Sequence, residues 1–305
     1  LINDFLYESN DIVSEFGLLS DYDIIVKNFN SYTENSSNYT EKEEYDVFSS
    51  LLFKTSLPLK KTSERSQNYL TPILAVRYSP NNTKNISDKD IKLNYNNIFS
   101  LNRIGSNEIV EGGKSVSIGL DYEKRDLEDN KIIGLNIANS IRDKKNDNLP
   151  TKSNLNNLRS DIVGSLSFNP NKILNFDYSF SYDQNLDGSN YDSIKTSINF
   201  NKFVTSFDFI SEDGDVGNNE IVKNTTTLKL NNENNLKFKT SKDLKNDFTE
   251  YYNLIYSYET DCLIASAEFN KKFYKDGNLV PDKSLLFTIR FIPFAEFKPA
   301  ATALN

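Results

Sequence analysis

The stretch Leu174-Asn175-Phe176-Asp177-Tyr178-Ser179-Phe180-Ser181-Tyr182 alternates large apolar residues with polar ones. Successive side chains of a β-strand point to opposite faces, so this period of two predicts a strand with one apolar and one polar face. The same alternation recurs later in the chain, at Leu254, Tyr256 and Tyr258, at Leu263, Ala265, Ala267 and Phe269, and at Leu285, Phe287, Ile289 and Phe291. The second half of the chain is therefore predicted to be a series of such strands.

The connections between the strands decide which kind of β protein this is. From residue 115 onward, short connections alternate with long polar ones, such as the short connection at 125–129 and the long one at 140–157. This alternation is typical of bacterial outer-membrane barrels, which have tight periplasmic turns and longer outer loops. The predicted strands cover residues 115–124, 130–139, 158–168, 172–181, 192–200, 202–210, 222–230, 235–241, 250–258, 262–272 and 284–292.

The first part of the chain continues the series. Strands are predicted at residues 2–8, 12–18, 22–30, 45–56 and 68–79, which gives sixteen predicted strands in all. Residues 80–114 form a long connection that we expect on the outer side. The predicted fold class is all-β, an antiparallel transmembrane β-barrel.

Composition limits the classes of function. The net charge of −8 argues against nucleic acid as a partner, because proteins that bind nucleic acid present a basic face. No His is present and Cys262 is the single cysteine, so the usual zinc ligands and the commonest general base are missing. We therefore expect no enzyme, no cofactor and no metal. Cys262 is either an inert thiol or the partner of a cysteine outside this chain.

Two groups of residues carry more information than the generic barrel pattern. The first consists of residues 71–80 (TPILAVRYSP) and 97–113 (NIFSLNRIGSNEIVEGG). The second consists of residues 259–266 (ETDCLIAS), 276–282 (DGNLVPD) and 285–289 (LLFTI). Together they resemble the C-terminal barrel of the lipopolysaccharide-assembly family, also called the organic-solvent-tolerance family. The loop motif of the first group makes Asn102, Arg103 and Gly105 candidate residues of an extracellular loop.

The resemblance implies an architecture. The family barrel has about 26 strands, so residues 1–305 would be its C-terminal portion. The missing initial Met and the absence of a signal peptide lead us to expect a fragment or processed product, with a periplasmic jellyroll encoded upstream.

The resemblance also implies a function. In the family, lipopolysaccharide passes along a periplasmic protein bridge and leaves sideways between the first and last barrel strands. The last strand, 284–292, would form one side of this lateral gate. The gate residues are Leu285, Phe287, Ile289 and Phe291, followed by Pro293, which either weakens the end of the seam or simply ends the strand.

The partners expected from the resemblance are lipopolysaccharide, the periplasmic bridge proteins, a plug lipoprotein, the barrel-assembly machinery and the outer membrane. In the family, a cysteine near the C-terminus bonds to one in the N-terminal domain, and Cys262 lies at the corresponding element. The residues themselves leave two alternatives open. One is a closed, porin-like channel, and the other is a soluble or surface-displayed β protein.

Overall fold

The computed structural model of the chain describes residues 2–34, 42–106, 109–273, 282–292, 295–297 and 302–303. Apart from the short 3-10 helix η1 (Thr151–Ser153), the regular structure of these residues consists of strands in antiparallel pairings. The predicted all-β, antiparallel class is therefore confirmed. The strands are β1 (Ile2–Glu8), β2 (Ile12–Val13), β3 (Leu19–Thr33), β4 (Lys42–Ser56), β5 (Leu59–Thr62), β6 (Gln67–Ser79), β7 (Gly113–Arg125), β8 (Lys131–Arg142), β9 (Ile162–Phe168), β10 (Leu174–Tyr182), β11 (Ser189–Phe200), β12 (Phe203–Glu212), β13 (Asn219–Lys229), β14 (Asn234–Asp243), β15 (Phe248–Glu259), β16 (Leu263–Lys272), β17 (Asp282–Phe291), β18 (Ala295–Phe297) and β19 (Thr302–Ala303).

The observed strands differ from the predicted ones at few places. Each predicted strand overlaps one observed strand, and the short strands β5, β18 and β19 were not predicted. The prediction of a strand over residues 12–18 is wrong, because only Ile12–Val13 is extended. The chain then turns at Gly17, whose φ of 81° lies in the left-handed region, and returns along β3 as the second arm of a hairpin.

The residues form two compact units. Unit 1 contains residues 1–166, 179–191 and 213–217, and unit 2 contains residues 167–178, 192–212 and 218–305. The strands β9, β10 and β11 contribute residues to both units. Each unit is described by itself below.

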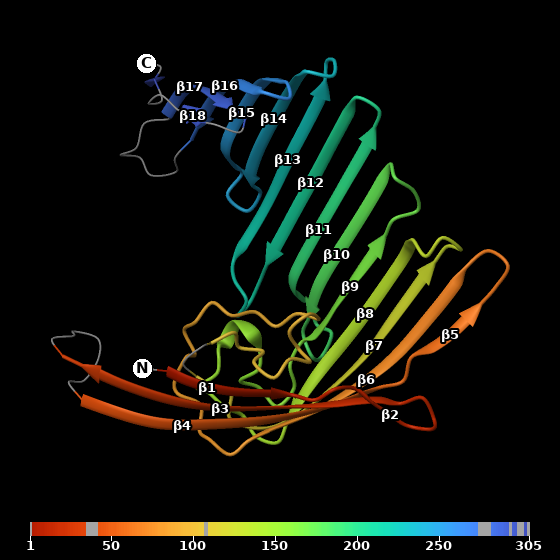
Figure 1. Cartoon of the computed structure of the whole chain (residues 1–305). Helices are drawn as coiled ribbons and strands as arrows, with labels where there is room; N and C mark the ends of the chain where they lie inside the picture. Colours follow the sequence, from red (N-terminus) through yellow and green to blue (C-terminus); the bar gives the residue numbers. More distant parts are fainter. Residues whose placement is uncertain are drawn as a thin grey trace. The chain divides into compact units, whose positions relative to one another are not determined.

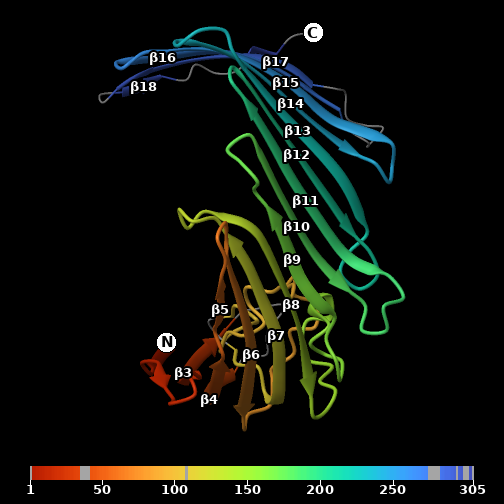
Figure 2. The ribbon, with the colours of Figure 1, turned by 90° about the vertical axis from the view of Figure 1, so that its right-hand side faces the viewer.

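The central strands of unit 1 have an inverted distribution of polarity. In β6, β7 and β8, which lie side by side in Figure 2, the covered face carries arginine and serine side chains, whereas the opposite face is apolar and exposed. A soluble sheet buries its apolar face, whereas a membrane barrel turns that face toward lipid. The covered polar side chains are Arg77, Ser79, Ser115, Ser117, Ser140 and Arg142, and the exposed apolar ones include Leu74, Val76, Ile118, Leu120, Leu135, Ile137 and Ile141.

Unit 2 repeats this separation across strands β14 to β17. Directly paired residues share a face of an antiparallel sheet, so one row consists of Phe238, Leu254, Phe269 and Leu285. The neighbouring row on the other face contains Asn253 and Asn270, which both donate hydrogen bonds to Glu268, at 2.6 Å and 2.9 Å. Among the described residues, no helix has the length and apolarity that crossing a membrane requires.

Candidate functional site

Two long loops of unit 1 fold against each other next to β6, β7 and β8. The β6–β7 loop (residues 80–112) and the β8–β9 loop (residues 143–161) are the orange-yellow and light-green traces gathered together in Figure 1. Asn148 Nδ2 donates to the Thr83 carbonyl at 3.0 Å, and the Ile86 amide donates to the Asn148 carbonyl at 2.8 Å. The two loops therefore form one packed body, with a hydrophobic core made of Ile86, Leu93, Ile98, Ile104, Leu149 and Leu155 together with Ala138 and Val163 of the sheet.

A buried carboxylate links the β6–β7 loop to the sheet. Glu111, at the end of the β6–β7 loop, is 1% exposed and pairs with three arginines from three different elements. Arg77 Nη1 of β6 lies 2.6 Å from Glu111 Oε2, and Arg103 of the loop binds both carboxylate oxygens, at 2.6 Å and 2.7 Å. Arg142 of β8 pairs with Oε1. The loop and two strands thus share one ionic centre.

Further donors of Arg77 and Arg103 are directed at hydroxyl and carbonyl oxygens, whereas the buried Nε of Arg142 has no hydrogen-bond partner among the described residues. Arg103 Nη1 donates to Ser140 Oγ at 2.7 Å, and Arg103 Nη2 donates to Ser115 Oγ at 2.9 Å. Arg77 Nε donates to the Leu101 carbonyl at 2.9 Å. Small hydroxyl side chains at these strand positions leave room for a guanidinium and also satisfy its donors, as burial requires.

The charges in this cluster do not cancel. Three arginines face one glutamate, so the cluster is formally positive by two charges although the whole chain is at −8. Burial by itself raises the pKa of Glu111, but the charges of Arg103, Arg77 and Arg142 and the hydrogen bonds from Arg103 outweigh it and lower that pKa. Glu111 is therefore ionised over the physiological pH range, and its negative charge permits the three guanidinium groups to lie together.

The predicted loop residues lie in and next to this centre. Arg103 is at its middle, while Asn102 Nδ2 donates to the Ser106 carbonyl at 2.8 Å and closes a local turn. Gly105 has a φ of 62°, a conformation that other residues adopt only with strain. Gly112 follows Glu111, and a Cβ at this position would lie 2.0 Å from the Asn81 carbonyl oxygen, so only glycine fits where the two ends of the loop meet.

A second buried carboxylate holds the β8–β9 loop. Asp161 Oδ2 accepts hydrogen bonds from Asn154 Nδ2 at 2.7 Å, Ser181 Oγ at 2.8 Å and Asn190 Nδ2 at 2.8 Å. Burial raises the pKa of Asp161, and these three hydrogen bonds only partly offset that effect. Asp161 connects the loop to β10 and β11 within unit 1.

The predicted gate residues belong to unit 2, whereas the buried cluster belongs to unit 1. Phe287, Ile289 and Phe291 of β17 are exposed by 51%, 41% and 52%, and Leu285 is half-buried. Pro293 lies outside the described residues. The expectation that this strand is the last one is corrected, because β18 and β19 follow it and pair with its far edge.

Cys262 lies in the short turn between β15 and β16, just before β16, although the sequence predicted it as the first residue of that strand. It is exposed and its thiol is free in this chain. A disulfide with another part of a longer protein stays a prediction.

Sequence reasoning found Arg103 but missed its partners. Glu111 lies inside the quoted loop motif, yet the pattern assigns no role to it, to Arg77 or to Arg142. The alternation in the sequence could have placed the two arginines on the polar face of the sheet, since each is next to apolar residues that face the opposite side. The described residues contain no group of three or more His, Cys, Asp or Glu side chains that could hold a metal.

Comparison with known proteins gives one family. The model of the family described as LptD, LPS transport system D, matches residues 12–254. No curated protein matches the chain. Among solved structures, one mutant of the Rh. blastica porin is 8% identical over 98% of this chain and 93% of its own, with a TM-score of 0.37. Another mutant of that porin is 10% identical over 97% of this chain and 100% of its own, with a TM-score of 0.35. These scores are too low to define the fold further.

Proposed function

Because the chain belongs to the family of LPS transport system D, we propose that it forms part of the outer-membrane barrel that inserts lipopolysaccharide into the outer leaflet. Family membership gives it a general role in lipopolysaccharide transport. The route, the membrane location and the partners are our proposal. The chain forms part of the wall of the transport barrel and carries out no catalysis.

The inverted polarity of β6, β7 and β8 is the observation that carries this proposal. Isoleucine, leucine and valine cover the exposed face, and arginine and serine cover the face on which the loops pack. In water, such an apolar surface would be unfavourable by about 25 cal/mol per Å². Against lipid chains the same surface has no such cost, so the distribution supports a strand wall between lipid and a polar interior.

The gate is the finer part of the proposal. We infer that lipopolysaccharide leaves beside β17, whose apolar side chains Phe287 and Ile289 would face the departing acyl chains. Among the described residues, the far edge of β17 pairs with β18 at three positions and with β19 at two, whereas its other edge pairs with β16 at ten. Each backbone hydrogen bond contributes only about 1 kcal/mol net, so the sparsely paired edge would separate first.

The proposed partners follow from this route. A periplasmic bridge of transport proteins supplies lipopolysaccharide, a plug lipoprotein occupies the interior of the barrel, and the barrel-assembly machinery inserts the chain into the outer membrane. Cys262 forms a disulfide with the N-terminal domain of the full-length protein, in keeping with the oxidising periplasm.

A photo-crosslinking experiment tests the route. A photoreactive amino acid replaces Phe287 or Ile289 in the full-length protein, and the cells are irradiated with and without depletion of the periplasmic bridge. We expect an adduct with lipopolysaccharide that disappears on depletion. The matched control carries the photoreactive residue at Phe207, an exposed aromatic of β12 far from the β17 edge in sequence, and should give no bridge-dependent adduct. A folded outer-membrane protein without an adduct at either β17 position would contradict the gate and favour a closed, porin-like channel.

A further inference from the structure

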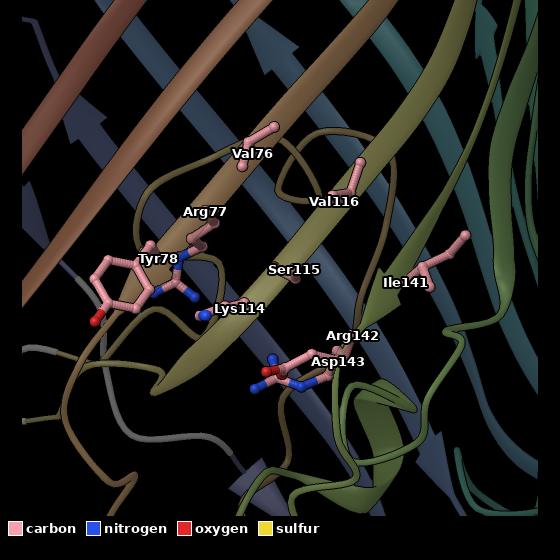
Figure 3. Close-up of a pocket in the computed structure, with 9 residues that line it drawn as sticks. All are labelled: Val76, Arg77, Tyr78, Lys114, Ser115, Val116, Ile141, Arg142 and Asp143. Atoms are coloured by element: carbon pink, nitrogen blue, oxygen red, sulfur yellow. The ribbon is translucent and has the colours of Figure 1, made fainter.

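An open apolar groove lies on the exposed face of unit 1, where β6 and β8 end and β7 begins. Val76, Val116 and Ile141 are directly paired across the three strands and form its apolar part. The groove has a volume of about 600 Å³, within the range of roughly 300–1,000 Å³ that ligand sites occupy. Figure 3 shows the three aliphatic side chains set apart from the charged ones.

The next row toward the loops changes from apolar to cationic. Tyr78 and Lys114 are directly paired, and Lys114 Nζ lies 5.7 Å from the centre of the Tyr78 ring. An aromatic residue beside a lysine at the end of an apolar strand face is the arrangement found at membrane–water interfaces. One end of the groove is therefore apolar, and the other end has the composition typical of a membrane–water interface.

A polar pocket of about 490 Å³ adjoins the groove at this end. The two hollows share Tyr78, Lys114, Arg142 and Asp143, and the polar one adds Lys144 and Lys145. The ammonium groups of Lys114, Lys144 and Lys145 form no ion pair with any described residue. Arg142 is already bound to Glu111, so the three lysines are the charges that a ligand would meet, opposed by Asp143 alone.

We propose that this surface is a resident binding site for lipopolysaccharide of the outer leaflet, distinct from the transport route. An acyl chain lies along Val76, Val116 and Ile141, and phosphate groups of the lipid lie among Lys114, Lys144 and Lys145. A free anion would not contact the apolar groove, and an uncharged lipid would form no ion pairs with the lysines. Three unpaired cations fit a glycolipid with more than one phosphate better than a lipid with a single charge. The inference rests on the proposed placement of the chain in the outer membrane.

Binding measurements on the full-length protein test this site. The protein is reconstituted in phosphatidylcholine nanodiscs, and its affinity is measured for lipopolysaccharide, for phosphatidylglycerol and for inorganic phosphate. The variant Lys114→Gln/Lys144→Gln/Lys145→Gln should lose affinity for lipopolysaccharide by on the order of 100-fold, since each lysine near an anionic lipid contributes about fivefold. The control Lys60→Gln/Lys61→Gln/Lys124→Gln has the same change in charge at the opposite ends of the strands and should bind like wild type.

A second variant tests the groove separately from the charges. Val116→Trp fills the apolar part and should weaken binding of lipopolysaccharide at least tenfold while the lysines are intact. Each of three results would overturn the proposal. The lysine variant could bind lipopolysaccharide as tightly as wild type, wild type could bind phosphatidylglycerol as tightly as lipopolysaccharide, or inorganic phosphate could compete fully with lipopolysaccharide. The crosslink at Phe287 separates this result from the proposed function. If the lysine variant still forms the bridge-dependent adduct at position 287 but no longer binds resident lipopolysaccharide, both inferences stand. If the protein with intact lysines binds resident lipopolysaccharide but forms no adduct at position 287, only the gate is contradicted.

Discussion

Glu111 is the residue on which the attachment of the β6–β7 loop depends. Its carboxylate is the counter-charge of Arg77, Arg103 and Arg142, so Glu111→Gln leaves three buried guanidinium groups without one. Removing one partner of a buried ion pair costs roughly 3–5 kcal/mol. We expect a loss of stability in this range in urea unfolding from lipid vesicles, together with faster protease cleavage within residues 80–112. Glu128→Gln, at an exposed turn, should change neither, and a stable variant with a protected loop would contradict this assignment.

The same carboxylate predicts a pH dependence. The pKa of Glu111 in the folded protein lies below its ordinary value of 4.5, so its ionisation stabilises the fold fully above pH 4.5. This contribution decreases as the pH falls below 4.5 through the lowered folded value. The stability difference between wild type and Glu111→Gln should therefore be constant from pH 7 to about 5 and shrink below pH 4.5. A difference that grows on acidification would contradict this sign.

Gly112 offers a test of the close approach between the ends of the loop. In Gly112→Ala the new methyl group would lie 2.0 Å from the Asn81 carbonyl oxygen, so the backbone must shift. We expect a destabilisation of about 1–3 kcal/mol, the usual cost of overpacking a close contact. Gly188→Ala is the matched control because a methyl group at that position would meet no atom within 4 Å, and it should be neutral. Equal stability of the two variants would show that the loop ends do not meet.

At the scale of a strand, β8 distinguishes a membrane wall from a soluble sheet. Ile137 lies on the exposed apolar face near the middle of the strand. If this face meets lipid, Ile137→Lys should destabilise the folded protein by roughly 2–4 kcal/mol in vesicles. Ile137→Leu should be close to neutral. A soluble sheet would tolerate the lysine at an exposed position, so an unchanged folding free energy in vesicles would favour the soluble alternative.

The β8–β9 loop contains buried residues that the sequence pattern did not predict. Its Asn-rich composition predicted a polar connection, and its polar residues do form turns. The loop nevertheless supplies Leu149 and Leu155 to the core shared with the β6–β7 loop. No periodic pattern of apolar residues identifies these two leucines as buried, because their burial depends on a partner loop that is distant in the sequence.

At the scale of the whole molecule, Cys262 provides a test of the link to the rest of the protein. Full-length protein from cells should migrate on a non-reducing gel as a form that changes on reduction, and Cys262→Ser should abolish that form. Ser266→Ala, a nearby position on β16, serves as the control and should leave it intact. A free thiol at Cys262, measured by alkylation of the folded protein, would contradict the proposed disulfide.

The residue pattern alone predicted most of the strands, their antiparallel class and the family. Alternation with a period of two is a local property, so residues 174–182 predicted β10 without knowledge of any neighbour. The error at residues 12–18 arose where a short alternating run met Gly17, whose backbone conformation depends on the hairpin. The contacts between polar residues follow from three-dimensional packing instead. Arg77, Arg103 and Arg142 come from two strands and a loop, and they converge on Glu111 because strand register and loop packing bring distant residues together, which no local pattern encodes.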